Sequence, residues 1–323
     1  MDAAMTDGAP DRPWRGVMVA TALPLRPGAH GADGAAGDLQ LDLDGYAEHL
    51  RALAAAGCDG AVPNGSLGEY QTLTPQERAA VVRTATEVAA ELPGFAVMPG
   101  VAAYGSAEAR RWAEQAGEAG AGSVMLLPPN AYRADERAVL DHYREVARAG
   151  LPVVAYNNPF DTKVDLTPPL LARLYGEGLI VAVKEFTGDV RRAYEIAELA
   201  PGLDLLVGSD DVALELAVAG AVGWVSGYPN ALPDACVRLW RGCRAVATGG
   251  PDADLAATVA LYRDLHPLLR WDARTEFVQA IKLSMDLAGR YGGPCRPPRI
   301  ALAPEHEQAV REATEKALAK GLR

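Results

Sequence analysis

Short apolar runs rich in β-branched residues alternate with helical patterns about eight times along this chain of 323 residues. Each pair of segments occupies roughly 25 to 30 residues, the spacing of strand and helix units. The predicted strands cover residues 17–20, 60–63, 95–99, 123–127, 153–156, 180–184, 204–207 and 223–226. The helices predicted after them cover residues 46–56, 75–91, 107–119, 136–149, 168–174, 190–199, 212–219 and 233–245.

Eight such pairs predict an α/β fold, the (β/α)8 or TIM barrel. A doubly wound sheet alternates in the same way, but its first strand normally leads into a glycine-rich phosphate loop, and here Thr21-Ala22-Leu23-Pro24 follows. Further helical patterns at 254–269, 273–288 and 304–318 predict a C-terminal helical extension. The expected organisation is a flexible N-terminus at 1–15, a barrel at 16–246 and the extension at 247–323, with a mobile loop at 28–37.

Capping signals support several helix boundaries. Thr74 precedes Pro75, and Glu77 lies three residues after the threonine, which is the pattern of a capping box with proline in the first turn. Ser106 and Thr167 are expected to begin their helices in a similar way.

Composition limits the partners of this chain. Its formal net charge is −11, whereas nucleic-acid binding needs clustered basic residues, so a small-molecule partner and no nucleic acid are expected. No stretch approaches the roughly 18 to 20 apolar residues of a membrane span, and the first residues lack the pattern of a signal peptide. The four cysteines show neither C-x-x-C spacing nor the density of a disulfide scaffold. We therefore expect a soluble, cytoplasmic protein without a membrane partner.

Lys184 stands at the end of the apolar run 179–183 and is one of only five lysines among 31 basic residues. A free lysine has a pKa near 10.4, and lowering it to about 7 costs on the order of 4 to 5 kcal/mol. The ordinary interpretation is an ammonium that reaches solvent or pairs with Glu185. The functional interpretation is an amine held ready for chemistry.

In a barrel, the residues at the carboxyl ends of the strands meet at one mouth. Lysine can attack a ketone to give a protonated Schiff base, which stabilises a carbanion on the neighbouring carbon without a metal or a bound coenzyme. Tyr156, on the adjacent predicted strand, can move the protons, and the backbone N–H groups of a Gly-Ser-x-Gly turn can bind a carboxylate. These residues predict an enzyme for 2-oxo acids with no cofactor. The expected mouth residues are Thr21, the segment 64–69, Tyr156, Lys184, Gly208 and Ser226.

In this order the motifs resemble the dihydrodipicolinate synthase / N-acetylneuraminate lyase family. They are Gly-Ser-Leu-Gly-Glu at 65–69, Tyr-Asn-Asn-Pro at 156–159 and Val-Lys-Glu-Phe-Thr-Gly at 183–188, and the likeness runs from Gly16 to about Ala319. The resemblance implies a class I aldolase-type lyase that is a homotetramer, built as a dimer of dimers with the extension at the interfaces. The roles it implies are Schiff-base formation for Lys184, general acid/base catalysis for Tyr156, binding of the substrate carboxylate for Gly65, Ser66 and the Leu67 amide, and a structural role for Glu69.

Three positions depart from the pattern of the synthase itself. Leu67 stands where the synthase has a second loop threonine, and Pro129-Asn130 where it has paired tyrosines, one of which crosses the dimer interface into a proton relay. Asp161 replaces an arginine that receives the second substrate, and a carboxylate there should repel an acidic aldehyde such as aspartate semialdehyde. Lysine biosynthesis is therefore disfavoured, and members that dehydrate or deaminate 2-oxo acids and cyclic imines are favoured.

The resulting hypothesis is a Schiff-base-forming lyase for a small 2-oxo acid or cyclic imine, either a dehydratase or deaminase, such as a pyrroline-4-hydroxy-2-carboxylate deaminase, or an aldolase. Three alternatives stay open: 4-hydroxy-tetrahydrodipicolinate synthase, a metal-dependent aldolase and a non-catalytic barrel that binds 2-oxo acids. The five histidines lie mostly on predicted helices or loops, which disfavours a metal site. Further residues expected to contact the substrate are Thr21, Gly208 and Ser226, with Asn130, Tyr132, Asp161 and Lys163 shaping the distal pocket.

Overall fold

The strands of the chain close into a barrel. The computed structural model describes residues 12–28 and 39–323. The main sheet has the order β5-β4-β1-β10-β9-β8-β7-β6 with parallel pairing, and an isolated parallel bridge between Gly100 and Met125 joins its two ends. The predicted (β/α)8 barrel is confirmed. Its strands are β1 (Gly16–Ala20), β4 (Gly60–Val62), β5 (Ala96–Val97), β6 (Val124–Leu126), β7 (Val153–Asn157), β8 (Ala182–Glu185), β9 (Asp204–Val207) and β10 (Gly223–Ser226).

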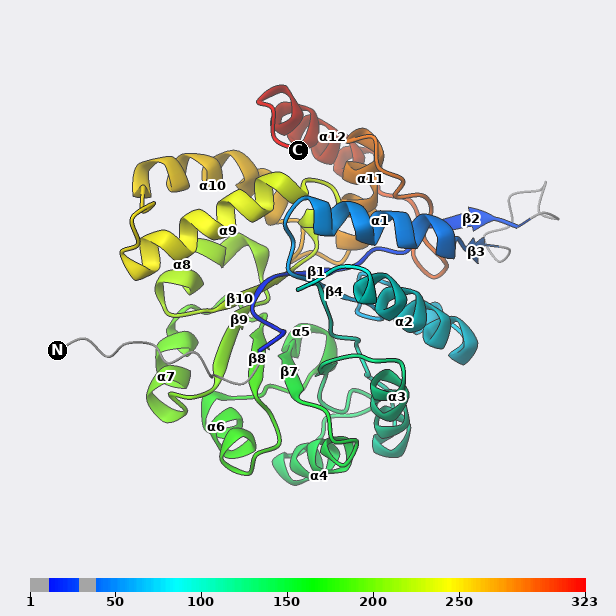
Figure 1. Cartoon of the computed structure of the whole chain (residues 1–323), viewed down its shortest axis with the longest axis vertical. Helices are drawn as coiled ribbons and strands as arrows, with labels where there is room; N and C mark the ends of the chain where they lie inside the picture. Colours follow the sequence, from blue (N-terminus) through cyan, green and yellow to red (C-terminus); the bar gives the residue numbers. More distant parts are fainter. Residues whose placement is uncertain (1–11, 29–38) are drawn as a thin grey trace.

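Helices surround this ring of strands (Figure 1). Parallel strands covered by helices are buried on both faces, which is why every residue of β7 and β8 is buried. Polar residues are therefore costly in these strands, and they occur only toward their carboxyl ends, at the barrel mouth. The surrounding helices are α1 (Leu43–Ala55), α2 (Pro75–Ala90), α3 (Ser106–Glu118), α4 (Glu136–Ala147), α5 (Pro159–Thr162), α6 (Pro168–Gly176), α7 (Arg191–Leu199), α8 (Ala213–Val218) and α9 (Pro233–Thr248).

The predicted helical extension is present as α10 (Leu255–Leu269), α11 (Phe277–Leu287) and α12 (Pro304–Ala319), stacked beside α9 and α1 in Figure 1. The prediction of one helix over 273–288 is wrong at its start. The amide of Arg274 bonds to the carbonyl of Trp271, and the amide of Phe277 bonds to that of Arg274, so this stretch forms short turns. These turns leave a loop between α10 and α11 that takes part in the site described below.

Other boundaries differ in smaller ways. The capping box of Thr74 and Glu77 is confirmed. Ser106 does not cap its helix, because Gly105 occupies the N-cap and the Ser106 hydroxyl bonds to Nδ1 of His142 at 2.9 Å. Thr167 is an N-cap without a side-chain capping bond.

A short antiparallel hairpin, β2 (Leu25–Pro27) with β3 (Leu39–Leu41), was not predicted. It flanks the expected mobile loop at 28–37, of which all but Gly28 lies outside the described residues, as does most of the expected flexible N-terminus. Within the described ranges, no helix combines the length and the apolar character needed to cross a lipid bilayer.

Candidate active site

Lys184 and Tyr156 lie side by side at the barrel mouth. They are directly paired in the parallel register of β8 and β7. Both line a cavity of about 180 Å³, and Nζ of Lys184 lies 4.2 Å from the centroid of the Tyr156 ring. Lys184 is only 6% exposed, and its Nζ has no hydrogen bond or ion pair with any residue that the structure describes. A buried ammonium without a partner is destabilised, so this environment favours the neutral amine.

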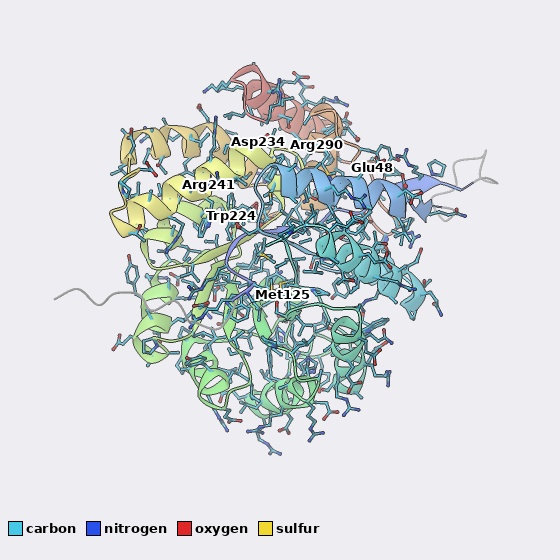
Figure 2. The ribbon with its side chains drawn as sticks, in the orientation of Figure 1. Glu48, Met125, Trp224, Asp234, Arg241 and Arg290 are labelled. Carbon is cyan, nitrogen blue, oxygen red and sulfur yellow. The ribbon has the colours of Figure 1, made fainter. Side chains whose placement is uncertain are left out.

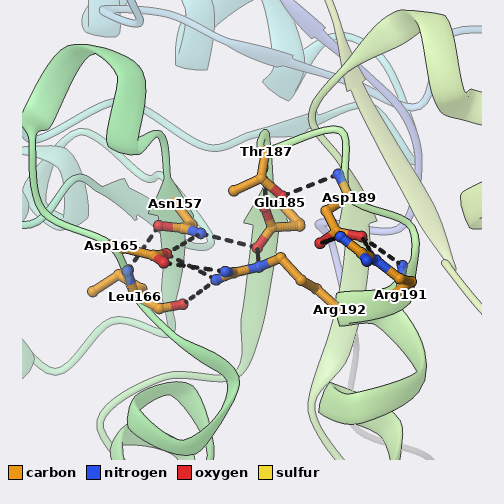
Figure 3. A network of polar contacts seen from close by, with 8 residues as sticks. All are labelled: Asn157, Asp165, Leu166, Glu185, Thr187, Asp189, Arg191 and Arg192. Carbon is orange, nitrogen blue, oxygen red and sulfur yellow. Dashed lines mark hydrogen bonds and ion pairs between the residues drawn. The ribbon is translucent and has the colours of Figure 1, made fainter.

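Glu185 does not pair with Lys184. Successive side chains on a strand point to opposite faces, and the Glu185 carboxylate points away from the mouth into the network of Figure 3. It accepts hydrogen bonds from the Thr187 amide at 2.8 Å, from Nδ2 of Asn157 at 3.0 Å and from Nε of Arg192 at 3.3 Å. This buried network ties the ends of β7 and β8 together and so holds Tyr156 and Lys184 in register.

Gly208 leaves room for the lysine side chain. A Cβ atom at this position would lie 3.0 Å from Cγ of Lys184 and 2.6 Å from the carbonyl oxygen of Glu185. Any side chain at 208 would therefore displace the lysine or the end of β8. Gly208 itself does not line the cavity.

Two buried carboxyl groups oppose the effect of burial on Lys184. Burial lowers the pKa of Lys184, whereas the charges of Asp272 and Asp210 raise it. Burial in turn raises the pKa of Asp272 to about 7 and raises that of Asp210 well above its usual range. Asp210 accepts hydrogen bonds from Nε1 of Trp224 and from the hydroxyl of Ser226, both at 2.8 Å. Burial and the neighbouring carboxyl groups therefore act on the pKa of Lys184 in opposite directions.

Tyr156 keeps its proton at neutral pH. Burial raises the pKa of this phenol, and the charge of Asp272 raises it further. Its oxygen accepts a hydrogen bond from Nδ2 of Asn158 at 3.3 Å, and the same amide group donates to the carboxylate of Asp161 at 2.9 Å. A protonated phenol beside an amine can deliver a proton to a reacting group and take it back.

The predicted carboxylate-binding turn forms another wall. Gly65, Ser66 and Leu67 line the cavity. The turn is held from outside by Glu69, whose carboxylate accepts hydrogen bonds from Nζ of Lys282 and from the Arg296 amide, both at 2.8 Å. The turn is therefore anchored to the helical extension. Figure 2 shows Met125, which also lines the cavity, near the centre of the ring of strands.

The remaining predicted residues lie in different places. Asp161 lines both the cavity and an adjoining vestibule of about 430 Å³, and Asn130 lines the vestibule alone. Thr21 and Ser226 are fully buried and line neither space. The Thr21 hydroxyl is hydrogen-bonded to the Tyr46 hydroxyl, and the Ser226 hydroxyl donates to the Asp210 carboxylate. Two residues expected in the distal pocket also lie outside both linings: Lys163 bonds to the Phe160 carbonyl, and Tyr132 is 63% exposed.

Sequence reasoning missed the contribution of the extension. Asp272, Arg274 and Thr275, from the loop between α10 and α11, and Arg299, from the connector before α12, all line the cavity. The one available signal was charge, because Asp272 and Arg274 lie in the charged segment 270–276 between two apolar helical patterns. Phe160 and Phe186 complete the apolar part of the wall.

The site offers an amine, a phenol, a carboxyl group and a turn of backbone N–H groups around one small cavity. This set can support covalent chemistry on a carbonyl compound. The described residues contain no group of three or more His, Cys, Asp or Glu side chains placed to hold a metal ion.

Comparison with known proteins gives consistent matches. The sequence profile described as "Dihydrodipicolinate synthetase family" matches residues 36–317. The 4-hydroxy-tetrahydrodipicolinate synthase of Methanothrix thermoacetophila is 30% identical over 310 residues, 94% of this chain and 97% of that protein. An uncharacterized DapA-like lyase of Halobacterium salinarum is 32% identical, over 84% of this chain and 87% of that protein. The solved structure of the 4-hydroxy-tetrahydrodipicolinate synthase of Methylacidiphilum fumariolicum superimposes with a TM-score of 0.83 at 26% identity, covering 95% of this chain and 97% of that one.

Proposed function

This chain belongs to the dihydrodipicolinate synthetase family, whose members are lyases of the class I aldolase type, and from this premise we propose that Lys184 forms a Schiff base with a small 2-oxo acid. The observation that carries the proposal is the position of Nζ of Lys184. This atom belongs to a side chain that is buried apart from the cavity, has no hydrogen-bonding partner among the described residues, and lies over the Tyr156 ring in a cavity that Gly65, Ser66 and Leu67 also line. No other described lysine combines burial with a lack of polar partners.

The proposed reaction begins when the neutral amine of Lys184 adds to the C2 carbonyl of the substrate. Loss of water then gives the protonated Schiff base. Removal of a proton from C3 leaves its electron pair as the C2–C3 double bond of an enamine, and the π electrons of the C–N bond become the lone pair on nitrogen. The enamine expels a hydroxyl at C4 together with its bonding electron pair, and the hydroxyl leaves with a proton as water. In a cyclic imine the lysine first displaces the ring nitrogen from C2; after loss of the C4 hydroxyl a proton shift makes a C5 imine, and its hydrolysis releases that nitrogen as ammonia. Hydrolysis of the new Schiff base returns the lysine and releases the product.

Tyr156 is the proposed acid and base for these transfers. Its raised pKa keeps the phenol protonated, so it can protonate the departing oxygen or nitrogen and then accept a proton in the next step. Ser66 and the amide of Leu67 are the proposed partners of the substrate carboxylate, since they lie on the cavity wall with Lys184. In this scheme Thr21, Gly208 and Ser226 act indirectly, by shaping or supporting the walls.

Between the reactions of the family we favour dehydration or deamination of a 2-oxo acid or cyclic imine, such as a hydroxylated pyrroline carboxylate. The site has Pro129-Asn130 in place of the paired tyrosines and Asp161 in place of the arginine of the synthase. Elimination needs the Schiff base and one proton shuttle, both of which the site can supply.

The second candidate is 4-hydroxy-tetrahydrodipicolinate synthase. It is favoured by the names of relatives that match nearly the whole chain. The two candidates are separated by supplying pyruvate with aspartate semialdehyde in one assay and a hydroxylated pyrroline carboxylate in another. We expect ammonia release in the second assay and negligible turnover in the first; the reverse result would establish the synthase.

The Schiff base itself is tested by adding borohydride to the protein in the presence of pyruvate, followed by peptide mass spectrometry. We expect a reduced adduct on Lys184 and none on Lys282, which serves as an internal control because it is buried but paired. An unmodified Lys184 would overturn the proposal. The proposal also includes a homotetrameric cytoplasmic enzyme, and sedimentation analysis measures the assembly.

A further inference from the structure

The wall of the active-site cavity that comes from the helical extension carries two guanidinium groups. Arg274 lies in the loop between α10 and α11, and Arg299 in the connector before α12, and both line the cavity that holds Lys184. Arg299 also lines the adjoining vestibule, together with Ser66 and Asp161. It therefore stands where the inner cavity opens outward.

Neither guanidinium is neutralised within the described residues, where neither forms an ion pair with a carboxylate. Arg299 is half-buried, donates one hydrogen bond to the Thr275 carbonyl at 3.1 Å and lies 5.2 Å from the centroid of the Phe277 ring. Arg274 is exposed and lies 4.3 Å from the centroid of the Trp271 ring. A guanidinium has five N–H donors, so most of the donors of Arg299 stay free for a ligand.

Arg296, three residues before Arg299, shows the contrasting case. Its guanidinium donates to the carboxylate of Glu77 and to the carbonyl oxygens of Leu39 and Thr72. Its donors serve the fold by tying the connector to β3 and α2. The same connector thus holds Arg296, whose donors bond to other parts of the protein, and Arg299, which lines the cavity.

The charges near the cavity opening favour an anion. Asp161 borders both spaces and accepts a hydrogen bond from Asn158 at 2.9 Å; Asp272 also lines the inner cavity, where burial raises its pKa to about 7, and Glu108 lines the vestibule together with Arg78. Arg274 and Arg299 keep their full charges on the cavity wall, and Arg groups bind carboxylates through paired hydrogen bonds in a partly desolvated site. The first carboxylate of a 2-oxo acid is already assigned to the Ser66 turn, so these arginines are available for a second one.

We propose that Arg299 and Arg274 bind a carboxylate at the far end of the substrate, so that among 2-oxo acids those with a second carboxylate distal to the keto group bind more tightly than those without one. This inference rests on the proposed Schiff-base chemistry at Lys184. In the synthase, an arginine at the position of Asp161 receives the second substrate. Here residue 161 is an aspartate, so the proposed anion-binding groups come from the helical extension instead. Arg299 contributes more than Arg274 to binding of this carboxylate, since Arg299 is less exposed and borders both the cavity and the vestibule.

The test compares three probes in the borohydride trapping assay on the full chain: pyruvate, 2-oxopentanoate and 2-oxoglutarate. The last two have the same number of carbons and differ in the distal carboxylate. We expect 2-oxoglutarate to half-saturate Lys184 at a concentration about tenfold or more below that of 2-oxopentanoate. Arg299→Gln should abolish this preference and Arg274→Gln should reduce it several-fold, with trapping by pyruvate as the reference value for each variant.

The matched control is Arg263→Gln, which removes an exposed arginine from α10, outside the cavity lining, and should change none of the three values. Equal trapping of 2-oxopentanoate and 2-oxoglutarate by the wild-type protein, with pyruvate still trapped on Lys184, would overturn this inference and leave the proposed function standing. Absence of any adduct on Lys184 with all three probes would overturn both. A preference for 2-oxoglutarate that survives in both arginine variants would also refute the assignment.

Discussion

The protein buries two lysines, one in the barrel wall and one in the helical extension, and their surroundings are opposite. Lys282, on α11, is 1% exposed and donates hydrogen bonds to the carboxylate of Glu69 and to the Pro294 carbonyl, both at 2.8 Å. Lys184, on β8, is 6% exposed and lies against aromatic rings, without a polar partner among the described residues. The two buried lysines therefore differ in their hydrogen bonding, and the proposed nucleophile is the one whose Nζ has no hydrogen-bonding partner among the described residues.

The two sites are also physically connected. Lys282 holds Glu69, and Glu69 ends the Gly65–Gly68 turn that lines the cavity around Lys184. In the proposed division, the paired Lys282 stabilises the scaffold and Lys184 is the nucleophile. The following experiments test this division, beginning with the largest expected effect.

Replacing Lys184 by Met should abolish the trapped pyruvate adduct and lower turnover by on the order of 10⁴-fold or more, because it removes the nucleophile. The free energy of unfolding, measured by urea denaturation, should stay the same or rise, since a buried amine without a hydrogen-bonding partner becomes an apolar side chain, and burial already favours the protonated forms of Asp272 and Asp210. A variant that keeps its adduct would show that the reactive amine lies elsewhere.

Replacing Tyr156 by Phe should lower kcat by about 10²- to 10⁴-fold, the usual contribution of a positioned acid and base. The substrate carboxylate is held by other groups, so KM should change much less, and slow adduct formation on Lys184 should persist. Steady-state kinetics and trapping rates measure the two effects. Unchanged kcat would assign the proton transfers to another group, such as Asp272.

Replacing Lys282 by Met should lower the free energy of unfolding by about 3–5 kcal/mol, because it leaves the Glu69 carboxylate buried without its cation. Activity should fall only if the loss of Lys282 moves Glu69 and thereby displaces the turn at Gly65–Gly68. Urea denaturation measures the loss, and adding Glu69→Gln to the variant should recover part of it. Full stability in the single variant would contradict the structural role assigned to this lysine.

The smallest expected effect is a pH shift in Asp272→Asn. The charge of Asp272 raises the pKa of Lys184, so removing it should lower that pKa and make the amine neutral at lower pH. The midpoint of the rate of adduct formation against pH should therefore move downward. The rates of adduct formation of the variant and the wild type should differ mainly above pH 7. The pKa of Asp272 is about 7, so below that pH its carboxyl group is largely uncharged in the wild type as well. An upward shift would contradict this electrostatic account.

Much of the barrel could be predicted from the sequence because its strands are short, apolar and bounded by turns. The predicted strands at 204–207 and 223–226 have the observed bounds, and the predicted 95–99 strand shortens to β5 (Ala96–Val97). The strand ends also placed Lys184 beside Tyr156, since neighbouring parallel strands share one edge. The early start predicted for α11 failed because residues 273–276, Ala-Arg-Thr-Glu, contain no glycine or proline to mark a boundary, whereas the hydrogen bonds there form separate turns.

The periodicity and the residues at strand ends thus determined the fold class, the family and the amine and phenol at the mouth, since these depend on local spacing and on the fixed geometry of parallel strands. Only the tertiary structure decided that Asp272, Arg274 and Arg299 join them, because these residues lie roughly a hundred positions further along the chain in irregular segments. Tertiary structure also decided which buried lysine is paired, because desolvation and ion pairing depend on distances in space that no local pattern records.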